Sequence, residues 1–204
     1  MMMAMGPSRR RASWTARVGA AVAVTVLAAG CSASSPPEDE QPPTESAALR
    51  VETVTGAERL DEQTRTEVEG AVGDVLSDYV LAAFLGEFPR QEFVQAFEPF
   101  TSVAARKATR DIDLLTAATA RDATDVRATD LDAKLSFLSQ EGEVHGGTAK
   151  VHFAFDATME DATTRPLVLD GRLMLQANDD GTWSIFGYDV TFDDGAGTPV
   201  EAES

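Results

Sequence analysis

The sequence predicts an α+β fold, with N-terminal helices packed on a curved antiparallel sheet of about four strands. Between Leu60 and Leu85, apolar residues recur at spacings of three and four, which is the period of an amphipathic helix. From Val126 onwards the apolar period changes to two, the period of half-buried strands. A run of helices followed by a run of strands favours helices on one face of an antiparallel sheet.

The longest helix is expected to begin after Asp61, whose side chain suits an N-cap, and to end before Gly86. An apolar stripe on one side of this helix would face the sheet. The residues of the stripe are Val68, Val72, Val75, Leu76, Tyr79, Val80 and Phe84.

Two shorter helices are expected to follow. Pro89 suits the first turn of one helix and Pro99 its end, and another helix is predicted around Ser102–Thr109. The side chains expected to reach the core from this region are Phe93, Phe97, Phe100, Ile112, Leu114 and Leu115.

The second half of the domain reads as alternating strands joined by turns. Trp183 and Ile185 are out of phase with Tyr188, so a bulge is predicted near Gly187, where it would let the sheet curve. The strands are predicted within Leu131–Phe137, Ala149–Ala157, Leu167–Leu175 and Phe186–Phe192, with Phe186 facing the core, and the turns at Glu141–Gly147 and Asn178–Gly181.

The N-terminus has the features of a bacterial export signal. Residues 1–17 carry four arginines and no acid, and a thirteen-residue apolar run follows at Val18–Gly30. That run is shorter than the roughly 20 residues of a membrane span. Three small residues directly precede Cys31, the only cysteine, and this arrangement resembles the lipobox of bacterial lipoproteins. The resemblance implies cleavage before Cys31 and acyl chains attached there.

Two alternatives for this segment stay open. It could be an ordinary secretory peptide with a chance cysteine, although an unpaired cysteine is uncommon in exported proteins. Ser8–Trp14 also resembles a twin-arginine export signal without the usual apolar pair after the arginines.

Four regions are predicted along the chain: a signal peptide at 1–30, a disordered tether at 31–48, a folded domain at 49–194 and a flexible tail at 195–204. The formal net charge of the chain is −17, from 34 acidic and 17 basic residues. This acidity argues against binding to nucleic acid or to anionic lipid. Attachment to the extracytoplasmic face of the cell membrane is therefore expected to depend on the lipid at Cys31.

The order of elements, together with the ending DGRLMLQANDDGTWSIFGYDVTF at Asp170–Phe192, resembles the ketosteroid-isomerase-like superfamily, also called nuclear-transport-factor-two-like. The resemblance spans roughly Leu60 to Asp193 and implies a cone, in which a strongly bent sheet wraps around a long helix. Arginine far outnumbers lysine, as is typical of high-GC bacteria. An acidic cone-fold lipoprotein of an actinobacterial type is what these resemblances imply.

The resemblance does not decide between catalysis and binding, because this superfamily contains enzymes with a carboxylate or histidine inside the cone and also proteins that only bind. His152 alternates with core-facing residues and is expected to face solvent, and His145 is expected in a turn, so neither suits a buried base. The residues in apolar phase that are candidates to line a pocket are Tyr79, Phe84, Phe97 and Tyr188.

No metal-ligand spacing, nucleophile elbow or phosphate-binding glycine loop occurs in the sequence, so neither a metal nor a cofactor is expected. The main hypothesis is a non-catalytic, lipid-anchored binding or accessory module that engages an envelope protein or a small apolar ligand. The alternative is an isomerase- or dehydratase-type enzyme with an atypical cone active site, which would need an interior cavity with an ionisable group. A third hypothesis is docking through the exposed sheet face, with Val168 and Met174 as its footprint.

Overall fold

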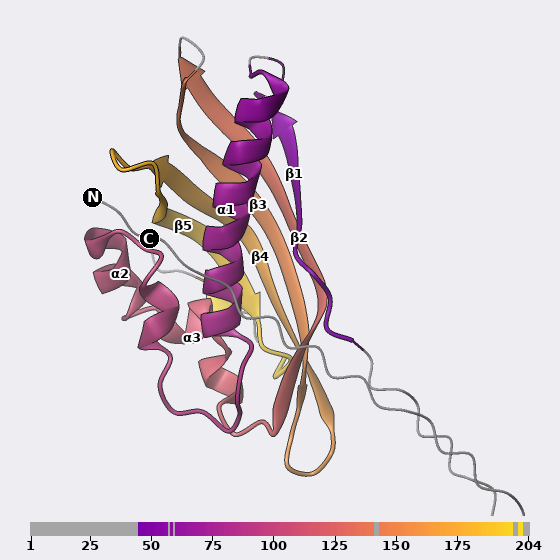
Figure 1. Cartoon of the computed structure of the whole chain (residues 1–204). Helices are drawn as coiled ribbons and strands as arrows, with labels where there is room; N and C mark the ends of the chain where they lie inside the picture. Colours follow the sequence, from indigo (N-terminus) through magenta and orange to yellow (C-terminus); the bar gives the residue numbers. More distant parts are fainter. Residues whose placement is uncertain (1–44, 57, 59, 141–142, 198–199, 202–204) are drawn as a thin grey trace, which may run out of the picture. The chain divides into compact units, whose positions relative to one another are not determined.

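The computed structural model describes residues 45–56, 58, 60–140, 143–197 and 200–201 of the chain (Figure 1). The predicted signal peptide, Cys31 and residues 31–44 of the predicted tether lie outside these residues. The elements are β1 (Arg50–Thr55), α1 (Glu62–Ala83), η2 (Val94–Phe97), α2 (Ser102–Ala108), α3 (Ile112–Leu115), η3 (Ala117–Ala120), β2 (Asp125–Gln140), β3 (Glu143–Thr158), β4 (Thr164–Ala177), β5 (Trp183–Asp193) and β6 (Val200–Glu201).

The described part of the chain forms a mixed sheet of six strands in the order β1 to β6. β1 lies parallel to β2, and each later pair is antiparallel. The predicted α+β class is confirmed, but the purely antiparallel sheet of about four strands was wrong, and the first described element is a strand instead of a helix. β1 gave no clear signal because it is short and largely exposed, and β6 has only two residues and lies within the predicted tail.

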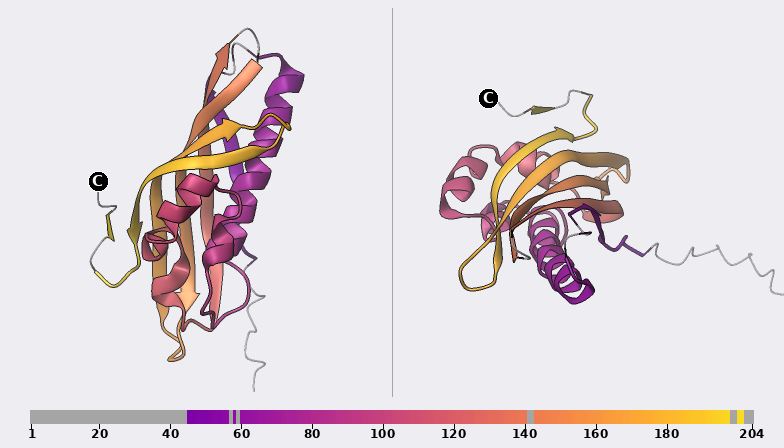
Figure 2. Two further views of the ribbon diagram at one scale, coloured as in Figure 1. Left: turned by 90° about the vertical axis from the view of Figure 1, so that its left-hand side faces the viewer. Right: turned by 90° about the horizontal axis from the view of Figure 1, so that it is seen from above.

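α1 begins and ends where its capping residues predict. The carboxylate of Asp61 accepts hydrogen bonds from the Thr64 amide (2.9 Å) and hydroxyl (2.7 Å), which satisfies a free donor of the first turn. The helix stops before Gly86, which has a φ of +100° that favours glycine. Its buried side lies against one face of the sheet (Figure 2) and consists of Val72, Leu76, Tyr79, Val80 and Ala83.

The helix predicted after Pro89 was wrong, because only the four-residue 3₁₀ turn η2 forms there. Tertiary hydrogen bonds hold this segment in an irregular path, from the Thr101 amide to Ile185 O and from the Ile185 amide to Pro99 O, both 2.9 Å. The core-facing side chains were predicted correctly, since Phe93, Phe97 and Phe100 are all buried, and α2 confirms the helix expected after residue 101.

The bulge predicted near Gly187 is confirmed, and it changes the direction of one large side chain. Met174 pairs with Gly187 while Leu175 pairs with Ile185, so Phe186 is the extra residue of β5. Trp183, Ile185 and Tyr188 consequently share the buried face. The prediction that Phe186 faces the core was wrong, because its side chain is 49% exposed on the opposite face.

The loop between β2 and β3 is shorter than predicted. β3 begins at Glu143, so most of the segment Glu141–Gly147 is strand instead of turn. The turn predicted at Asn178–Gly181 is confirmed, since it lies between the end of β4 and the start of β5.

Candidate functional site

The interior between α1 and the sheet is filled with apolar side chains. Among the described residues, the buried polar or charged ones are Thr116 and Asp194. The Thr116 hydroxyl donates to Ile112 O (2.7 Å), and Asp194 forms an ion pair with Arg165 (2.6 Å). The Thr116 hydroxyl is therefore in a hydrogen bond and the Asp194 carboxylate in an ion pair. The described interior offers no free acid or base for proton transfer.

The four residues predicted to line a pocket lie together in this interior. The ring of Phe100 contacts three of them, with centroid distances of 5.4 Å to Phe97, 5.6 Å to Tyr79 and 6.3 Å to Tyr188. Phe84 lies 6.1 Å from Tyr79 in an edge-on arrangement. The four side chains thus pack ring against ring, and the hollows described below are lined by other residues.

Both tyrosine hydroxyls are occupied by hydrogen bonds. Tyr79 donates to Leu115 O and Tyr188 donates to Asp111 Oδ2, each over 2.6 Å. Burial raises the pKa of Tyr79 well above its ordinary value, with a smaller contribution from Tyr188. Burial also raises the pKa of Tyr188, and the hydrogen bond and the negative charge of Asp111 raise it further. Both phenols therefore stay protonated at neutral pH and act as structural donors.

The two histidines lie at the surface. His152 faces solvent as predicted, and its Nδ1 lies 2.8 Å from Asp170 Oδ1 across the β3–β4 pair. His145 is also exposed, but it lies on β3, so the prediction of a turn position was wrong.

In the part of the chain that the structure describes, no group of three or more His, Cys, Asp or Glu side chains is placed to hold a metal ion. Within the same residues, no helix combines the length and apolar character that crossing a membrane requires.

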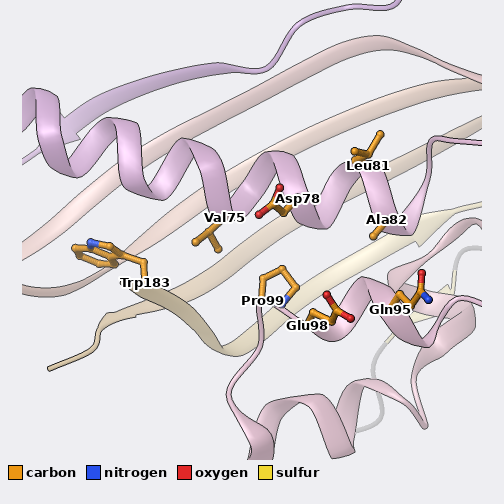
Figure 3. A pocket seen from close by; sticks show the side chains of 8 residues that line it. All are labelled: Val75, Asp78, Leu81, Ala82, Gln95, Glu98, Pro99 and Trp183. Carbon is orange, nitrogen blue, oxygen red and sulfur yellow. The ribbon is translucent and has the colours of Figure 1, made fainter. Parts of the chain in front are cut away.

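A groove of about 480 Å³ lies between the C-terminal half of α1 and the segment that follows η2. Figure 3 shows Val75 and Asp78 of α1 opposite Pro99 and Glu98. We call this feature the α1 groove and define it by its lining residues Val75, Asp78, Leu81, Glu98, Pro99 and Trp183.

A second hollow of about 260 Å³ lies on the other side of Leu81, between α1 and the first strands. It shares Asp78 and Leu81 with the α1 groove and is otherwise mainly apolar, with Leu49, Leu85 and Leu131 among its lining residues. Leu81 is 58% exposed, so it forms an apolar ridge between two hollows. An exposed large apolar side chain in this setting is typical of a contact surface.

The charges at the α1 groove are all of one sign. Asp78 on α1 and Glu98 beyond η2 both line the groove, and neither forms an ion pair with any described residue. A groove with an apolar floor and unpaired carboxylates at its sides complements a segment that combines apolar and positively charged side chains.

Sequence reasoning missed Leu81, although the sequence contained a signal for it. Leu76, Tyr79 and Val80 belong to the buried stripe, whereas Leu81 lies outside that stripe. A large apolar residue on the solvent side of an amphipathic helix is a candidate contact residue. The groove itself depends on tertiary packing against Pro99 and could not be predicted.

Comparisons with protein-family models, with curated proteins and with solved structures found no match for this chain. The functional conclusion therefore depends on the chain's own residues, above all on the contrast between the filled interior and the α1 groove.

Proposed function

We propose that this protein is a non-catalytic binding module, held at the outer face of a bacterial cell membrane by a lipid on Cys31. The contrast between the filled interior and the open α1 groove is the observation that carries this proposal. An isomerase or dehydratase of the cone type needs an acid or base inside the cone, and the described interior contains none that is free. Binding at the surface needs only the groove and its exposed Leu81.

We further propose that the domain is a cone of the ketosteroid-isomerase-like kind. Two features support this assignment. The long helix α1 packs on one face of a curved sheet, as Figure 2 illustrates. The bulge at Phe186 and Gly187 also lets β5 bend across the end of the sheet.

The proposed partner at the α1 groove is a segment of an envelope protein that carries apolar and positively charged side chains. The carboxylates of Asp78 and Glu98 would attract the positive charges, and Val75, Pro99 and Trp183 would contact the apolar side chain. Complementary charge speeds association and selects the partner, while apolar contact supplies most of the affinity.

Membrane attachment is tested by replacing the cysteine. The Cys31→Ser variant should move from the detergent phase to the aqueous phase in a detergent-partitioning assay, because the domain would lose its acyl chains. A Ser32→Ala control should stay in the detergent phase. Unchanged partitioning of the Cys31→Ser variant would contradict the proposed anchor.

Binding at the α1 groove is tested with Trp183, which lines it. In the mature chain, which would begin at Cys31, Trp183 is the only tryptophan, so its emission reports on the groove. The acetylated peptide KLKFK should change this emission with a dissociation constant on the order of 1 mM, and the peptide ELEFE should not.

Leu81→Gln should weaken KLKFK binding about fivefold, which corresponds to about 1 kcal/mol. Val103→Gln is the matched control, because Val103 is also exposed (71%) and helical but lies on α2. Equal effects of the two peptides, or equal affinities of the two variants, would rule the groove out as the binding site.

A further inference from the structure

The outer face of the sheet, which faces away from α1, contains a second large hollow of about 480 Å³. Residues from four neighbouring strands, β2 to β5, line it. We call it the double-bulge hollow and define it by Leu138, His145, Gly146, Thr148, Gln176 and Phe186.

Two separate irregularities of the sheet meet at this hollow. On β3, Gly146 pairs with Leu138 and Val144 pairs with Ser139, so His145 is an extra residue. On β5, Phe186 is the extra residue in the same way. A bulge interrupts the ladder and redirects a side chain, and bulges are enriched next to binding and active sites. Here both extra side chains line one hollow.

Glycine lets neighbouring strand backbones approach closely at the floor of the hollow. A Cβ atom on Gly146 would lie 2.8 Å from Leu175 O, and one on Gly147 would lie 2.7 Å from Ser136 O, so a side chain at either position would clash with the backbone. Leu138 and Phe186 lie at the sides of this floor and are 72% and 49% exposed. Two exposed apolar side chains therefore bound a hollow that is open to solvent.

A row of charged side chains, most of them positive, lies along the same face. Lys134 on β2 and Lys150 on β3 are opposite each other in register, with Glu52 on β1 beside Lys134 and Arg172 on β4 beside Lys150. Arg172 pairs with Asp189 over 2.7 Å, whereas the two lysines form no ion pair with any described residue. Like charges directly opposite each other destabilise a sheet. The two lysines nevertheless lie opposite each other, in a chain that has a formal charge of −17.

We propose that the double-bulge hollow is a docking site for an extended segment of a partner protein that carries an apolar side chain followed, two residues later, by a carboxylate. Lys134 and Lys150 lie two residues along their strands from Ser136 and Thr148 at the rim of the hollow, a distance of roughly 7 Å. Two residues of an extended peptide cover the same distance. The apolar side chain lies between Leu138 and Phe186, and the carboxylate binds the two lysines.

The test is a titration of the ¹⁵N-labelled full chain in phosphatidylcholine nanodiscs, followed by the amide signals of Gly146, Thr148 and Lys150. The acetylated peptide SFSES, in which Phe precedes Glu by two residues, should shift these signals, and the charge-reversed peptide SFSKS should not. A variant with both Lys134→Gln and Lys150→Gln should bind SFSES at least about fivefold more weakly, as should Phe186→Ser. Lys107→Gln, which changes the third lysine of the chain, is the matched control and should bind normally.

Unchanged signals outside the hollow confirm that each variant is folded. Equal shifts with both peptides, or no shift with SFSES, would overturn the proposal. Shifts caused by phosphatidylglycerol vesicles but not by SFSES would overturn it in favour of a lipid surface. Leu81→Gln should leave SFSES binding unchanged, so the proposals for this site and for the α1 groove can be contradicted independently.

Discussion

The two faces of the sheet use the same alternating strands for different purposes. On the inner face, residues such as Phe153, Phe155 and Leu169 are fully buried, and the alternation is regular. On the outer face, two bulges break the alternation and turn His145 and Phe186 towards one hollow. Regular alternation therefore builds the core of this domain, whereas its interruptions and its exposed apolar residues create the two surfaces that we propose bind partners.

The largest expected difference between the two faces is in stability. Phe155 is 1% exposed and stacks on Phe84 at a centroid distance of 4.5 Å, so Phe155→Ala should lower the free energy of unfolding by about 3–5 kcal/mol. Phe186→Ala, on the outer face, should lower it by less than about 1 kcal/mol. Urea unfolding followed by circular dichroism measures both, and comparable losses would contradict the division between core and docking surface.

A smaller effect is expected from the buried phenol of Tyr79. Its pKa is raised in the folded protein, while an unfolded tyrosine ionises near pH 10. The contribution of Tyr79 to stability is therefore complete below about pH 10 and is lost above it, by up to about 1.4 kcal/mol per pH unit. Tyr188 acts in the same direction, because its pKa is also raised.

The variant Tyr79→Phe separates the contribution of Tyr79 to this pH dependence from that of Tyr188. This variant should lose about 1–2 kcal/mol at neutral pH, because Leu115 O loses its hydrogen bond, and it should show a shallower decline above pH 10. Urea unfolding at a series of pH values gives both quantities. An unchanged alkaline slope would mean that the hydroxyl of Tyr79 is not held protonated by the core.

The smallest expected effect has the opposite sign. Lys150→Glu replaces two like-charge pairs, with Lys134 on β2 and Arg172 on β4, by opposite-charge pairs, so it should stabilise the domain by about 0.2–1 kcal/mol. The same change should abolish binding of SFSES. A gain in stability with a loss of binding is the pattern expected of a functional site. The gain should shrink at high salt, and Lys107→Glu, on α2, should neither stabilise the domain nor weaken binding of SFSES.

Much of the fold, but little of the binding surface, follows from the sequence. The course of α1 was predictable because Asp61 and Gly86 mark its ends and its apolar period is clear. β1 was missed because six largely exposed residues carry no strong alternation, and its parallel pairing with β2 depends on the position of a distant segment. Neither the strand itself nor its parallel pairing can be recognised from the residues of β1 alone.

The outward direction of Phe186 was not predictable, although the bulge was. The apolar residues before and after Gly187 are out of phase, which predicted a change of register there. Which side chain becomes the extra one depends on a shift of a single residue, and the sequence does not determine that shift. His145 was assigned to a turn because glycines follow it, whereas those glycines belong to a strand whose backbone approaches its neighbours closely. The hollow forms only when the folded sheet brings the bulges of β3 and β5 to the same place on either side of β4.

The central claim, that this domain acts through its surfaces, is tested most directly by photo-crosslinking in the native envelope. A photoreactive benzoyl-phenylalanine would replace Leu81, Phe186 or Val103 in the full chain. We expect discrete adducts from positions 81 and 186, suppressed by KLKFK and SFSES respectively, and none from position 103. The same adducts from all three positions, or adducts that neither peptide suppresses, would contradict it.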